Sequence, residues 1–116
     1  MHRFSSKGIW MAASFGTALA VMSSAAPLRA QGKSVSDIYL DKCAVCHGAD
    51  GAGKTARGRK LKVKDVRSTV SKETVEQMAE VVVKGKAPNM DGYAKEFSAD
   101  QIRQLVEHYR SLATKK

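Results

Sequence analysis

"DKCAVCHGADGAGK", residues 41–54, contains both cysteines of the 116-residue chain and one of its three histidines. Cys43 and Cys46 are three positions apart, and His47 follows the second cysteine directly. Side chains at positions i, i+3 and i+4 of a helical turn project from the same side. We therefore expect two thiols and one imidazole to face a single object at the end of a helix.

A porphyrin fits this arrangement, because its two vinyl groups lie on neighbouring edges and its iron lies at the centre. The spacing C-x-x-C-H is the attachment signature of c-type haem, in which both thiols add across the vinyl groups. The histidine must follow the second cysteine at once to come under the iron. The sequence thus predicts one covalent haem c on Cys43 and Cys46, with His47 as the proximal iron ligand.

Three other uses of these side chains stay open. A redox-active C-x-x-C pair needs no adjacent histidine and usually lies in a βαβ setting, which the sequence does not indicate. A structural zinc ion needs four ligands, and only His108 is left to join the three. A disulfide between Cys43 and Cys46 closes a small ring and stabilises little. Haem attachment is the interpretation that the spacing favours.

The first 30 residues predict an export signal. Arg3 and Lys7 supply a basic start, and the apolar run at residues 8–22 falls short of the roughly 20 residues of a membrane-spanning helix. We expect cleavage after Ala30, or else after Ala26 or Ala25. An uncleaved membrane anchor is the alternative.

Cleavage would leave residues 31–116 as one exported, periplasmic domain without stable membrane insertion. Residues 31–116 hold 17 basic and 11 acidic side chains. They have only four aromatic residues for a core: Tyr39, Tyr93, Phe97 and Tyr109. A domain of this size is marginal on apolar burial alone and often needs a disulfide, a metal or a cofactor.

Apolar periodicity predicts an all-α domain of three helices, over residues 35 to about 46, 72–84 and 99 to about 113. We expect the first helix to begin at Ser34 or Ser36 and the second at Ser71. Ser98 and Gln101 form a capping box at the start of the third. Two apolar stripes follow helical spacing, one made of Val75, Met78, Ala79, Val82 and Val83, the other of Ile102, Leu105, Val106, Tyr109 and Leu112.

Two long loops, residues 48–70 and 85–97, separate the predicted helices. Loops of this length in so small a domain are unusual unless they wrap a ligand. Met90 lies in the second loop, two residues after Pro88, which stiffens the segment. Its thioether is our candidate for the distal iron ligand, whereas we expect Met78 to pack in the core and His108 to lie at the surface.

In these features the chain resembles the class I c-type cytochromes, the small monohaem electron carriers. The resemblance rests on "CAVCHG", "GADGAGK", the loop methionine and the last helix ending in "HYRSLA", and it covers residues 34–114. It implies thioether bonds at Cys43 and Cys46 and axial ligation by His47 and Met90. It also implies a close crossing of the first and last helices. Many relatives carry proline directly after the ligand methionine, whereas this chain has Asp91.

A haem with two axial ligands has no open position for a substrate, and methionine ligation raises its reduction potential. We therefore expect a monomeric one-electron carrier and no enzyme activity. If Met90 does not bind iron, the alternative is a five-coordinate peroxidase-like enzyme or gas sensor. A third option is an electron-entry subunit of a larger exported complex.

Basic residues cluster in residues 54–67, and they predict redox partners with acidic docking surfaces rather than nucleic acid. Arg57 and Arg59 are our candidates for pairing with the haem propionates. The cluster consists of Lys54, Arg57, Arg59, Lys60, Lys62, Lys64 and Arg67, with Asp65 among them.

Overall fold

The computed structural model describes residues 32–115, so the predicted export signal at residues 1–30 lies outside them. Helices and irregular segments make up this part of the chain, and its only β-type pairing is one bridge between Lys86 and Met90. The all-α prediction is confirmed. The helices are α1 (Val35–Lys42), α2 (Ala44–His47), α3 (Ala56–Lys60), α4 (Val66–Thr69), α5 (Val75–Lys84) and α6 (Ala99–Ser111), followed by the 3-10 turn η1 (Leu112–Thr114).

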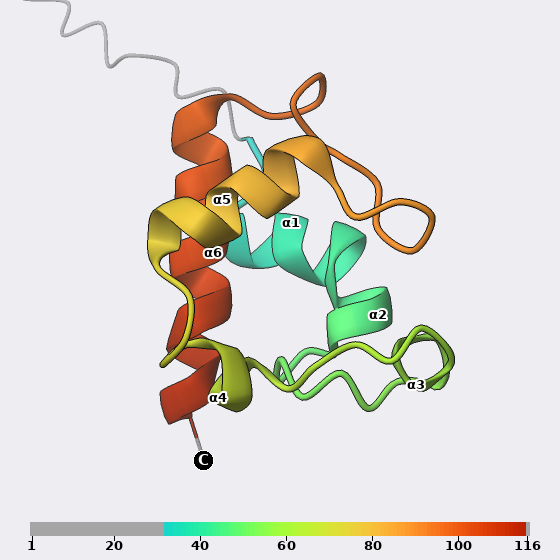
Figure 1. Cartoon of the computed structure of the whole chain (residues 1–116). Coiled ribbons are helices and arrows are strands. Elements are labelled where there is room, and N and C mark those ends of the chain that lie inside the picture. Colours follow the sequence, from blue (N-terminus) through green and yellow to red (C-terminus); the bar gives the residue numbers. More distant parts are fainter. Residues whose placement is uncertain (1–31, 116) are drawn as a thin grey trace, which may run out of the picture.

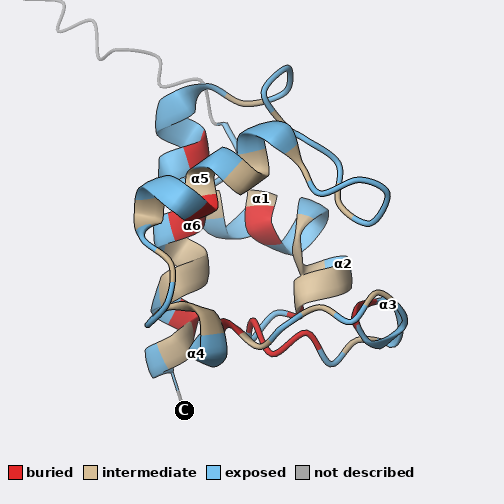
Figure 2. Cartoon of the chain, in the orientation of Figure 1, coloured by how far each residue is buried: buried red, intermediate tan, exposed pale blue. Residues whose placement is uncertain are grey.

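Helix α6 is the central helix of the fold, and both α1 and α5 pack against it (Figure 1). It begins with the predicted capping box, in which Ser98 Oγ accepts from the amide of Gln101 and Gln101 Oε1 accepts from the amide of Ser98. Its predicted stripe is confirmed, because Ile102, Leu105, Val106 and Leu112 are all buried (Figure 2).

Helices α1 and α6 meet at the predicted crossing. The Tyr39 ring is 2% exposed and stacks on Tyr109 with a centroid distance of 6.1 Å. Its hydroxyl donates to the carbonyl of Gly48 at 2.7 Å, which ties α1 to the residue after α2. His108, predicted at the surface, is half-buried instead, since its ring lies 5.1 Å from that of Tyr39.

The predicted helix at residues 35–46 is divided at Cys43. Helix α1 begins after the N-cap Ser34 and ends at Lys42, and Cys43 has φ −109° and ψ −41°. The hydrogen-bond ladder nevertheless continues, because the Cys43 amide donates to Tyr39 O and the His47 amide donates to Cys43 O. The chain therefore makes one further helical turn, α2, which carries Cys46 and His47.

Helix α5 begins three residues later than predicted. Thr74, not Ser71, is its N-cap, and Gln77 completes a capping box. The amides of Lys72 and Glu73 instead donate to Thr69 O, which extends the turn after α4. Serine favours the N-cap position, but the turn after α4 takes up an amide that Ser71 would have capped.

Residues 48–70 contain two short helices that the sequence does not predict. Thr55 caps α3 by accepting from the Gly58 amide, and Asp65 caps α4 by accepting from the Arg67 amide. Val66 lies in the core at 0% exposure. None of the helices in residues 32–115 is long and apolar enough to cross a membrane.

Candidate haem-binding site

A cavity of about 490 Å³ lies among α2, α5, α6 and the two long loops. Its volume is within the roughly 300–1,000 Å³ of pockets that hold small molecules and cofactors. All four predicted site residues line it: Cys43, Cys46, His47 and Met90. The fold thus brings together side chains that are 47 positions apart in the sequence.

Helix α3 holds the cysteine-bearing turn in place. The Thr55 hydroxyl lies 2.8 Å from Val45 O and 3.2 Å from Cys46 O, both of which can accept its hydrogen bond. Gly58 packs directly against this turn, and a Cβ at Gly58 would lie 2.2 Å from Cys46 O. The Gly53 amide donates to His47 O at 2.7 Å. The orientation of α2 is therefore fixed by the Thr55 hydroxyl and by close backbone contacts with Gly53 and Gly58.

His47 is suited to bind a metal through a lone pair. Burial lowers its pKa, so its imidazole is neutral at neutral pH. Its Nδ1 is buried and has no hydrogen-bond partner in residues 32–115, and Tyr109 meets the ring edge-on at a centroid distance of 5.1 Å. Buried polar atoms are usually paired, and neutral imidazole is the form that ligates metals. An iron ligand at this position fits both observations.

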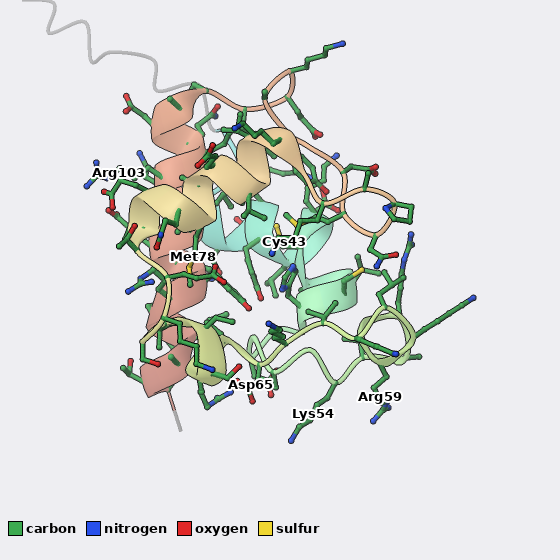
Figure 3. All side chains as sticks on the ribbon, viewed as in Figure 1. Cys43, Lys54, Arg59, Asp65, Met78 and Arg103 are labelled. Carbon is green, nitrogen blue, oxygen red and sulfur yellow. The ribbon has the colours of Figure 1, made fainter. Side chains whose placement is uncertain are left out.

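The two thiols are free, which argues against a disulfide between them. Burial, and to a lesser degree the nearby Cys46, raises the pKa of Cys43 to about 11, so its sulfur carries a proton. Within the part of the chain that the structure describes, no three His, Cys, Asp or Glu side chains gather as a metal ion would need. The donor set fits the two thioether bonds of a c-type haem better than a zinc site. Figure 3 shows Cys43 in the interior of the molecule, between α1 and the loop after α5.

The loop that carries Met90 is closed at its base. The Lys86 amide donates to Met90 O at 2.8 Å, and the Met90 amide donates to Lys86 O at 2.9 Å. Gly92 makes a close backbone approach there, because a Cβ at Gly92 would lie 2.6 Å from Val83 O. The half-buried Met90 side chain is therefore held on the cavity wall by a hydrogen-bonded loop.

Met78 also lines the cavity, which the sequence does not predict. It is 6% exposed, so the expected core packing is confirmed. Its sulfur lies 3.5 Å from Nη1 of Arg110 and accepts a hydrogen bond from it. The neighbouring α5 residues Val81 and Val82 line the same cavity, and for this reason the apolar face of α5 is only partly covered by protein.

Basic residues reach the cavity from the loop around α3. Arg57, Lys62 and Lys64 line it, whereas Arg59 does not. Arg59 extends outward from α3 (Figure 3), so its pairing with a haem propionate stays a prediction that the cavity lining does not favour. Lys62 and Lys64 are further candidates; their place on the wall depends on the fold of the loop, which the sequence pattern does not give.

Comparison with known proteins decides the family. The family model described as "Cytochrome C oxidase, cbb3-type, subunit III" matches residues 30–108. The chain belongs to this cytochrome family. A member of such a family carries covalently bound haem c, and the C-x-x-C-H motif at residues 43–47 fits that cofactor.

Solved structures agree with the fold. The KustC0563 c-type cytochrome superposes with a TM-score of 0.63 at 23% identity, covering 68% of this chain and 96% of its own. A tyrosine-to-phenylalanine mutant of that protein gives a TM-score of 0.61 at 22% identity, covering 67% and 96%. No curated protein matches the sequence significantly. The chain is thus a small c-type cytochrome, and its general role is haem-based electron transfer.

Proposed function

We propose that residues 31–116 form an exported, periplasmic one-electron carrier with a single haem c bound to Cys43 and Cys46 and ligated by His47 and Met90. The observation that carries this proposal is the presence of His47 and Met90 on the wall of one cavity, beside both cysteines. When bound, the haem supplies a one-electron couple. The chain's own residues hold it, orient it and keep water away from it.

Met90 is the better of two candidate distal ligands. The sulfur of Met78 already accepts a hydrogen bond from Arg110, and its side chain is packed between α5 and α6. Met90 lies on a loop whose base is closed by backbone hydrogen bonds with Lys86, so its sulfur can be offered to the iron without disturbing a helix. Two protein ligands leave no open coordination position, and a carrier rather than an enzyme follows from that.

Carbon monoxide tests this assignment, because it binds ferrous haem only where a coordination position is free. The reduced wild-type protein should take up carbon monoxide slowly or not at all at neutral pH. Met90→Ala should bind it rapidly and should have a lower reduction potential, since loss of the soft sulfur donor removes a preference for ferrous iron. Met78→Leu is the matched control for ligation and should, like the wild type, take up carbon monoxide slowly or not at all.

Rapid uptake by the wild type, unchanged in Met90→Ala, would replace the carrier with the five-coordinate alternative. A pyridine haemochrome spectrum of the same samples reports thioether attachment separately from axial ligation. Loss of that spectrum in Cys43→Ala or Cys46→Ala is expected, and its full retention in both would contradict the proposed attachment sites.

The partners that suit this carrier are exported redox proteins with acidic docking surfaces. Six exposed basic side chains on and around α3 have no ion-pair partner in residues 32–115: Lys54, Arg57, Arg59, Lys60, Lys62 and Lys64. We call these six the basic strip. Val45, 52% exposed, lies next to Cys46 and lines the same cavity as Arg57, Lys62 and Lys64. A partner attracted to the strip would therefore meet the protein beside the haem, with a monomer sufficient for the exchange.

A further inference from the structure

Arg110 is a charged residue in an unusual place. It lies near the end of α6, is half-buried, and has no carboxylate within ion-pair distance in residues 32–115. Its guanidinium instead donates to two backbone carbonyls, to Glu73 O at 2.5 Å and to Val70 O at 3.2 Å. The third acceptor is the sulfur of Met78 at 3.5 Å.

All three contacts lie on one side of the haem cavity. Met78 and Glu73 line the cavity, and Thr69, just before Val70, lines it as well. The guanidinium therefore lies directly behind this wall and joins the α4–α5 connection to α6. A single side chain thus contacts the Met78 sulfur and brings a positive charge close to the cavity wall.

The charge of Arg110 is poorly neutralised. Hydrogen bonds at the start of α5 are the main cause of the lowered pKa of Glu76, and the charge of Arg110 contributes less than that of Arg103. The interaction between Glu76 and Arg110 is therefore weak. The Glu76 side chain is 72% exposed and lies 4.0 Å from Arg103, so water and a second arginine share its charge. A half-buried cation is screened less by salt and solvent than an exposed one.

We propose that Arg110 is a positioning residue that raises the reduction potential of the haem and fixes the Met78 side chain on the cavity wall. Reduction adds one electron to the haem, and a nearby fixed positive charge stabilises the reduced form relative to the oxidised form. The inference rests on the proposed carrier function. It adds a specific electrostatic determinant outside the four ligand residues.

The test compares potentials of folded, haem-loaded variants by spectroscopic redox titration. Arg110→Gln should lower the potential by a three- to tenfold change in the reduction equilibrium, where tenfold corresponds to 59 mV for one electron. Arg110→Lys keeps the charge but cannot reach all three acceptors with a planar fork. The reduction potential of Arg110→Lys should therefore stay close to that of the wild type, while the variant should unfold at a lower denaturant concentration.

Arg103→Gln is the matched control on the same helix. Its side chain is exposed, pairs with Glu107 at 3.2 Å, and extends away from the cavity (Figure 3), so the potential should not change. If Arg110→Gln does not fold, Arg110→His allows the reduction potential to be compared with residue 110 charged and uncharged in one protein, because imidazole is charged near pH 5 and neutral near pH 8. Its potential should then rise at acid pH more than that of the wild type.

An unchanged potential in Arg110→Gln, or equal losses in Arg110→Gln and Arg110→Lys, would overturn the role of the charge. In Arg110→His, a pH dependence no steeper than that of the wild type would do the same. These results are distinct from failure of the carrier proposal, which would appear as rapid carbon monoxide binding by the wild type or as absence of its haemochrome spectrum.

Discussion

At the scale of single residues, His108 gives the fold a dependence on pH. Burial, and then the charge of Lys115, lowers the pKa of His108, although the C-terminal end of α6 favours a cation there. The unfolded chain therefore binds a proton at His108 before the folded chain does. This contribution leaves stability unchanged above about pH 6.5 and reduces it as the pH falls from there toward the lowered pKa.

His108→Gln should remove this part of the pH dependence. In denaturant titrations of the haem-loaded protein, the wild type should lose more stability than the variant between pH 7.5 and pH 5. Because His47 is present in both proteins, the difference between them reports His108 alone. Equal losses would show that burial and Lys115 do not lower the pKa of His108 in the folded protein.

At the scale of secondary-structure elements, α3 acts as the support of the haem-binding turn, and Gly58 is the residue on which this depends. A Cβ at Gly58 would lie 2.2 Å from Cys46 O and 2.5 Å from Gly53 O, both backbone atoms that cannot rotate away. Gly58→Ala should therefore displace α3 and lower the free energy of unfolding by about 1–3 kcal/mol, the usual range for overpacking.

Arg59→Ala, on the same helix but exposed, should change the free energy of unfolding by less than about 0.5 kcal/mol. Urea unfolding of both variants, followed by far-UV circular dichroism and by haem absorbance, provides the measurement. Wild-type stability in Gly58→Ala would mean that α3 can move without cost and does not support the turn.

Helix α3 also shows which parts of the fold can be predicted from the sequence and which cannot. Helices α5 and α6 have apolar residues at helical spacing, so periodicity predicts both of them, although the start predicted for α5 is three residues too early. Helix α3 has five residues, "ARGRK", and no apolar periodicity, so nothing in its pattern predicts a helix. Its helical turn depends on the Thr55 cap and on contact with a turn ten residues earlier in the chain.

The candidate site likewise contains residues that the sequence predicts and residues that only the tertiary structure shows. Cys43, Cys46 and His47 are contiguous, and their spacing alone carries the chemistry. Arg110 contacts residues 32 to 40 positions earlier, so only the tertiary structure indicates its place behind the cavity. Met78 illustrates both levels, since periodicity predicts its burial but not its position on the cavity wall.

At the scale of the whole molecule, basic charge is unevenly distributed around the cavity. Helix α3 lies at the far end of its loop from α4 and α6 (Figure 1), and the basic strip extends from α3 along the segment that leads to α4. Such an arrangement attracts anionic reaction partners to one face, and salt weakens the attraction. The rate of electron transfer to ferricyanide, an anion, should therefore fall as ionic strength rises, whereas the rate with a cationic cobalt complex should rise.

The double variant Lys60→Glu/Lys62→Glu separates this local effect from that of net charge. Its rate with ferricyanide at low salt should fall several-fold, which is less than the roughly 10- to 1,000-fold that full electrostatic steering can contribute, and its salt dependence should flatten. Lys72→Glu/Lys115→Glu changes the net charge equally at two exposed positions outside the strip and should lose less. Stopped-flow rates at several salt concentrations measure both. Equal falls in rate for the two double variants would mean that net charge alone controls the reaction and that ferricyanide does not approach preferentially at the basic strip.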